Sequence, residues 1–84
     1  MPGRKTTKQL SSELERYRNN LATPSKWQHV KSGGIYIALD VAYLERTMEK
    51  MVTYRSVDAD VTFIRPYQEF LGKFRMVNKE KGDA

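Results

Sequence analysis

Residues 50–66 read KMVTYRSVDADVTFIRP, and this stretch decides the fold class. Side-chain types in residues 50–56 alternate between two faces, as a half-buried strand requires. The Asp-Ala-Asp of residues 58–60 suits a hairpin turn, and residues 61–65 form a return strand. Pro66 has no backbone donor for a sheet ladder, so the strand should end there or lie at an edge. The stretch therefore predicts a β-hairpin.

Further strands flank this hairpin on both sides. Residues 44–49 fit either a loop or one helical turn, and residues 67–71 fit a single helical turn. The turn near Gly33 and Gly34 tolerates positive φ. The other predicted strands cover residues 27–30, 35–43 and 73–77. Four or five short strands joined by tight turns indicate a small barrel or a strongly bent sheet, which needs closure or a covering helix to be stable.

An amphipathic helix is predicted over residues 7–21, on an apolar stripe of Leu10, Leu14, Tyr17 and Leu21. Ser12 with Glu15 is a candidate capping box, and Thr6 or Thr7 are the other candidate N-caps. Pro24 ends the helix. The stripe either packs on the strands, which is the simplest use, or binds a groove of a partner protein.

The net charge of +5 lies entirely in residues 1–31, and the remainder of the chain is balanced. Such a basic segment suits nucleic acid or an acidic protein surface, although surplus positive charge also serves solubility. The candidate anion-binding residues of this segment are Arg4, Lys5, Lys8, Arg16 and Arg18.

Three ordered pieces of residues 27–77 resemble a known family. Residues 29–36 are similar to its His-x-Lys-Gly-x-x-Tyr opening with one residue inserted. Ala42 and residues 47–55 resemble its Ala…Thr-x-Glu-x-Met-Val-x-Tyr-Arg centre, and residues 63–66 with Phe70 resemble its Trp-Val-Arg-Pro…Phe close. This is the domain of unknown function 1653 family of bacteria and their phages.

The resemblance implies an SH3-like barrel and no established activity. Two positions depart from the family's pattern: Phe63 stands where tryptophan is usual, and Asp40 where glycine is usual. Residues 1–26 are an addition to the family core. This addition carries the charge surplus and could therefore confer a specific role.

Enzyme activity is not expected. The chain has one histidine, His29, and no cysteine, which excludes Cys–His catalysis and ordinary zinc sites. We expect His29 to be a satisfied side chain at the end of a strand. Asp58 and Asp60 suit a turn better than a metal site. The sequence thus predicts no catalytic residue, no metal and no cofactor.

Arg55 and Arg65 are the remaining candidates for anion binding, because guanidinium groups among aromatic rings can hold phosphate or stack on a base. The structural alternative for Arg65, which we favour, is a clamp on Glu69 or on backbone carbonyls. We expect the aromatic side chains of Trp27, Tyr36, Tyr43 and Phe63 to be core or half-core.

The sequence therefore predicts a mainly β protein with an N-terminal helix, built as an SH3-like barrel of four to five strands. Residues 1–26 form a basic tail and helix, 27–78 the barrel and 79–84 a polar tail. The chain lacks cysteine and any long apolar run, so we expect a cytoplasmic protein without membrane contact.

The expected function is non-catalytic binding, with nucleic acid or an acidic protein surface as the partner. One alternative is a modulator that docks on a cellular enzyme through the apolar stripe or an open sheet edge. The other is capture of nucleotides between subunits, which would require an oligomer.

Overall fold

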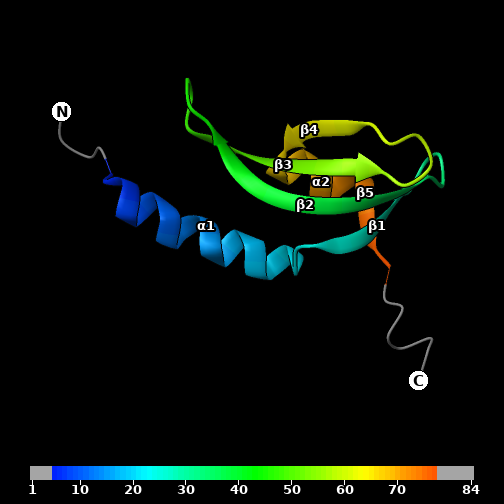
Figure 1. The fold of residues 1–84 in the computed structure, drawn as a ribbon, viewed down its shortest axis with the longest axis horizontal. Helices are drawn as coiled ribbons and strands as arrows, with labels where there is room; N and C mark the ends of the chain where they lie inside the picture. Colours follow the sequence, from blue (N-terminus) through cyan, green and yellow to red (C-terminus); the bar gives the residue numbers. More distant parts are fainter. Residues whose placement is uncertain (1–4, 78–84) are drawn as a thin grey trace.

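The computed structural model describes residues 5–77, which form a five-stranded antiparallel sheet with two helices (Figure 1). The strands run in the spatial order β4-β3-β2-β1-β5. The predicted class, mainly β with an N-terminal helix, is confirmed. The elements are α1 (Thr7–Leu21), β1 (Ser25–His29), β2 (Ile35–Leu44), β3 (Glu49–Ser56), β4 (Thr62–Pro66), α2 (Tyr67–Lys73) and β5 (Phe74–Met76).

The sheet bends but is not closed. Strands β4 and β5 are its two edges, and within residues 5–77 no ladder joins them. The long strand β2 curves along its length (Figure 1). Its register with β3 shifts between Ala38 and Asp40, as a β-bulge produces. Within residues 5–77 the expected barrel is thus a bent open sheet, whose edge strands β4 and β5 are connected by helix α2 and are not paired with each other.

The predicted hairpin forms in register. Tyr54 of β3 lies opposite Phe63 of β4, and Met51 lies opposite Pro66. The strand ends at Pro66 on the edge of the sheet, as its missing donor requires. Residues 45–48, which the sequence left open, form a turn, and the predicted helical turn after Pro66 extends to Lys73.

Of the candidate N-caps, Thr6 is confirmed, and the candidate capping box of Ser12 and Glu15 is wrong because Ser12 lies inside the helix. The Oγ1 of Thr6 accepts a hydrogen bond from the N–H of Gln9 at 3.1 Å. The Oε1 of Gln9 accepts one from the N–H of Thr6 at 2.9 Å. This pair satisfies the first free donors of the helix, and Ser12 lies inside it.

The apolar stripe of α1 packs on the protein's own sheet, which is the simpler of the two predicted uses. Leu21 is fully buried, while Leu14 and Tyr17 pack against the core. The ring of Tyr17 meets that of Tyr67 edge-on, with centroids 4.8 Å apart. The buried core comprises Leu21, Trp27, Ala38, Val41, Met51, Val52, Tyr54, Tyr67, Phe70 and Phe74. Helix α1 is therefore part of the folded unit and not a detached arm.

Within residues 5–77, neither helix has the length and apolar composition needed to cross a membrane. The first strand begins at Ser25, two residues before the predicted start of the sheet. The predicted polar tail, residues 79–84, lies outside the described residues.

Candidate functional site

Side chains from five strands and one turn surround a small cavity of about 150 Å³. We call it the Phe63 pocket. Its lining residues are His29, Ser32, Tyr36, Tyr54, Phe63, Arg65 and Phe74. Strand β1 pairs antiparallel with both β2 and β5, so the first and the last strand of the chain lie side by side at this pocket. All the lining residues except Phe74 belong to the three family-like pieces of sequence.

The walls of the Phe63 pocket are aromatic. Cross-strand pairing places Phe63 over Tyr54, and their rings stack with centroids 5.6 Å apart. Tyr36 meets Tyr54 edge-on at 5.5 Å and Phe74 at 5.4 Å. Tyr54 is 4% exposed, whereas Phe63 is 42% exposed. Phe63 was expected in or near the core, but it lies on an edge strand and keeps one face open to solvent.

Arg65 is held in place by two polar contacts. Its Nε donates a hydrogen bond to the hydroxyl of Tyr54 at 3.1 Å, and its Nη1 donates one to Glu69 at 2.7 Å. The guanidinium carbon lies 5.7 Å from the centre of the Phe74 ring. The hydrogen bond to Tyr54, with the nearby Glu69 carboxylate, raises the pKa of Arg65 and keeps it charged. The favoured clamp on Glu69 is present, and the same side chain also lines the pocket.

His29 is a satisfied side chain at the end of β1, as expected. Its Nδ1 accepts a hydrogen bond from the backbone N–H of Ser32 at 3.1 Å. The Oγ of Ser32 lies 3.0 Å from the same nitrogen. Because Nδ1 is an acceptor here, the neutral ring carries its proton on Nε2. Within residues 5–77 no carboxylate hydrogen-bonds to His29. His29 and Ser32 therefore form a turn contact and, in this part of the chain, lack the carboxylate that would orient the histidine in a catalytic triad.

Several of the predicted anion-binding residues are engaged in ion pairs. Lys5 contacts Glu13 at 3.0 Å, and Arg55 contacts Asp60 at 2.6 Å. Arg18 contacts Asp40 of β2 at 2.6 Å. Arg4 lies outside the described residues. The structure thus assigns Lys5, Arg18 and Arg55 to internal contacts that the sequence did not reveal.

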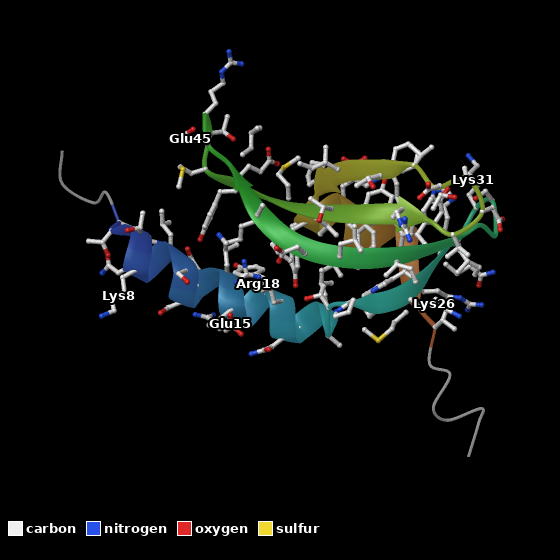
Figure 2. All side chains as sticks on the ribbon, in the orientation of Figure 1. Lys8, Glu15, Arg18, Lys26, Lys31 and Glu45 are labelled. Atoms are coloured by element: carbon white, nitrogen blue, oxygen red, sulfur yellow. The ribbon has the colours of Figure 1, made fainter. Side chains whose placement is uncertain are left out.

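Two predicted residues, Lys8 and Arg16, are exposed on α1 and line one shallow depression there. Among residues 5–77 neither forms an ion pair, and the same holds for Lys26 and Lys31. Lys8 and Lys31 lie toward opposite ends of the molecule (Figure 2). These four basic residues therefore lie on α1, on β1 and in the β1–β2 turn, and they are not gathered on one arm.

A second cavity, a groove of about 620 Å³, lies between the start of α1 and the β2–β3 hairpin. Leu10, the first residue of the apolar stripe, lines it together with Tyr43 and Lys50. Lys50 also lies over the Tyr17 ring, 4.8 Å from its centroid. The groove exists only because α1 docks on the sheet.

Glu13 links the two sides of this groove. Its carboxylate accepts a hydrogen bond from the Tyr43 hydroxyl at 2.6 Å and lies 3.9 Å from the Lys50 Nζ. The hydrogen bonds from Tyr43 and Lys5 lower the pKa of Glu13. Burial and the bond to Glu13 raise the pKa of Tyr43 to about 12. This cluster fastens α1 to the sheet and was not predicted.

In the described part of the chain, no group of three histidine, aspartate or glutamate side chains is placed to hold a metal ion. Asp60 lies in the β3–β4 turn with a φ of 57°, and its carboxylate forms an ion pair with Arg55. Of the residues that line the Phe63 pocket, only Arg65 was predicted to bind an anion. His29, Tyr36 and Phe63 were expected to be structural, and Ser32 and Phe74 were not predicted to have a role. Ser32 lies within the family-like opening, but Phe74 gave no local signal.

The comparisons with known proteins agree with the resemblance seen in the sequence. The family described as "Protein of unknown function (DUF1653)" matches residues 25–82, which is most of the chain. No curated protein and no solved structure was found that matches it. The matched segment starts where β1 starts, so α1 lies before the family region. The chain belongs to the DUF1653 family of proteins of unknown function.

Proposed function

We propose that this protein is a non-catalytic module that binds single-stranded nucleic acid. The observation that supports this most directly is the Phe63 pocket, where an exposed aromatic face lies beside a charged arginine. Single-stranded nucleic acids are commonly bound by aromatic side chains on which bases stack, next to basic residues that contact the backbone. Both elements are present in this pocket.

The charge distribution favours the same class of ligand. Lys8, Arg16, Lys26 and Lys31 are spread along the molecule, and among residues 5–77 none of them is neutralised by an ion pair. With a net charge of +5, the protein attracts a polyanion over distances comparable to the Debye length. An extended strand can reach side chains that lie far apart, whereas a compact anion cannot.

The test measures binding of the protein to single-stranded RNA, single-stranded DNA and duplex DNA over a series of salt concentrations. We expect binding to the single strands, with affinity falling as salt rises. Phe63→Ala should weaken binding about 5- to 150-fold, the effect of losing one stacked base. Ile64→Ala, at the neighbouring exposed position on β4, is the matched control and should leave the affinity unchanged.

A second variant tests the electrostatic part. Lys8→Gln combined with Arg16→Gln should flatten the slope of log affinity against log salt by up to about 1.4, since two phosphate contacts are lost. Glu15→Gln on the same helix is a control with the opposite change in charge. If none of the polymers binds at low salt, the proposed function is wrong.

A protein partner is the second candidate, and one observation favours it. Strand β4 is an edge strand, and its flanking and central side chains, Val61 and Ile64, are exposed. An extended segment of another protein could add to this edge through backbone hydrogen bonds. An affinity pull-down in high salt after nuclease treatment should then retain one stoichiometric protein. The Ile64→Asp variant should no longer retain that protein in the pull-down.

A further inference from the structure

The Phe63 pocket has room for one flat group and little more. Its volume of about 150 Å³ equals the share of roughly five water molecules in the liquid. This is half the lower end of the range of ordinary small-molecule pockets, about 300 Å³. Tyr36 meets Phe63 edge-on, with centroids 6.3 Å apart and planes inclined at 70°, and Phe63, which stacks on Tyr54, is 42% exposed. A planar ring system can stack on the exposed Phe63 ring, which a sugar or a peptide segment does less well.

The pocket also holds polar donors that the protein leaves unused. Arginine has five N–H donors, and Arg65 uses its Nε donor for Tyr54 and one of the two Nη1 donors for Glu69. Within residues 5–77 no hydrogen bond engages the second Nη1 donor or the two Nη2 donors. His29 uses Nδ1 as an acceptor, so the proton of its neutral ring is on Nε2, which has no partner in the described residues. The pocket therefore offers N–H donors and needs a ligand with acceptors on its edge.

The two contacts of Arg65 fix the plane of its guanidinium before any ligand arrives. A pre-positioned donor loses less conformational entropy on binding than a mobile one. A lysine at the same place would supply charge without this planar arrangement. The pocket is thus suited to a ligand whose acceptors lie side by side in the plane of a ring.

We propose that the Phe63 pocket holds one unpaired nucleobase and prefers guanine, an inference that rests on the proposed binding of nucleic acid. Guanine presents two adjacent acceptors, O6 and N7, which arginine contacts as a pair. Adenine presents N7 beside an amino donor, which opposes the guanidinium. Cytosine offers neighbouring acceptors on another edge, but its single ring stacks over less area.

The test uses the intact protein and single-stranded oligothymidines that carry one central guanine, adenine or cytosine, with unbroken oligothymidine as the reference. We expect the guanine oligonucleotide to bind about 5- to 150-fold more tightly than the adenine one, the discrimination of a paired arginine contact. Replacing the guanine by 7-deazaguanine, which lacks the N7 acceptor, should remove most of this preference. These measurements need no variant and hence do not depend on how a mutant folds.

Two variants connect the preference to the pocket. Arg65→Lys keeps the charge and should abolish the preference for guanine while the oligothymidine still binds. Ile64→Ala should preserve the preference, because this side chain does not line the pocket. Circular dichroism spectra must show that both variants remain folded. Persistence of the guanine preference in folded Arg65→Lys would overturn the assignment.

The remaining outcomes separate this inference from the function on which it rests. Equal affinity for all the oligonucleotides would end the guanine assignment and leave the proposed function standing. Absence of binding to every oligonucleotide would end both. Inorganic phosphate that competes as strongly as guanosine monophosphate would show an anion site in place of a base site, and would also overturn the inference.

Discussion

The Nε of Arg18 donates a hydrogen bond to Oδ1 of Asp40 at 2.6 Å, which joins helix α1 to the bulge of strand β2. Asp40 lies within the segment that matches the family, and its carboxylate also accepts a hydrogen bond from the backbone N–H of Val41 at 2.7 Å. Arg18 lies before the segment that matches the family. The ion pair therefore connects the helix that precedes the family-matched segment to a strand inside that segment.

Asp40→Asn should lower the free energy of unfolding by about 0.5–1 kcal/mol, since the variant keeps the oxygen acceptor but loses the charge of a partly exposed ion pair. Urea denaturation at low and high salt measures the effect, which should shrink as salt screens the pair. Glu15→Gln is the matched control, because this weaker contact to the same arginine is 3.4 Å long. No difference between the two variants at low salt would contradict the role of Asp40.

Tyr43 should ionise at a higher pH than an ordinary tyrosine. Its pKa is raised to about 12 by burial and by the hydrogen bond to Glu13, from an ordinary value of 10.0. The neutral hydroxyl stabilises the folded state fully below pH 10, and this contribution is lost as pH rises toward 12. A spectrophotometric titration of phenolate absorbance should contain a late component, with a pKa of about 12, that belongs to Tyr43.

Glu13→Gln should move that late component back toward the ordinary tyrosine range, because the carboxylate that accepts the hydrogen bond is removed. Tyr43→Phe should delete it altogether. If the late component survives in Tyr43→Phe, another tyrosine is responsible.

Acidification should also weaken the cluster of Glu13 and Tyr43, through protonation of Glu13. The pKa of Glu13 is lowered by hydrogen bonds from Tyr43 and Lys5, so its charged form stabilises the folded state above the ordinary value of 4.5. This stabilisation declines as pH falls through the lowered pKa. Thermal unfolding of the wild type should therefore lose more stability at acid pH than Glu13→Gln does. Parallel acid profiles for the two proteins would rule out this contribution.

Thr6→Ala should destabilise the protein by about 1 kcal/mol, the usual cost of removing an N-cap hydroxyl. The hydroxyl accepts the N–H of Gln9, and alanine leaves that donor without its partner. Equilibrium denaturation measures the change. Thr7→Ala alters the first residue of the helix without touching the cap and should change stability far less. An equal loss in both variants would argue against the capping box.

Phe70→Ala should cost about 3–5 kcal/mol, enough to leave a domain of this size largely unfolded. Phe70 is 0% exposed and stacks on Phe74 with centroids 4.3 Å apart. Its neighbour Leu71 is 40% exposed, so Leu71→Ala on the same helix is the matched control and should cost under about 1 kcal/mol. A cooperative, wild-type-like unfolding transition in Phe70→Ala would contradict the proposed core.

The sequence alone determined the local elements. The stripe from Leu10 to Leu21 has the helical period, and residues 50–66 have the strand period and a turn between them, so neighbours along the chain suffice to predict α1 and the β3–β4 hairpin. The resemblance in the family-like pieces likewise indicated the family that the comparison then showed. Periodicity depends on residues a few positions apart and can be read without the fold.

Only the tertiary structure decided which charges are neutralised and where a pocket lies. Arg18 and Asp40 are 22 residues apart, and no pattern in the sequence pairs them. The Phe63 pocket needs His29 and Phe74, which are brought together by the antiparallel pairing of β1 with β5. Such contacts depend on strand order and register across the whole sheet. The sequence therefore predicted a basic arm, and the folded chain shows a docked helix whose cations are partly engaged.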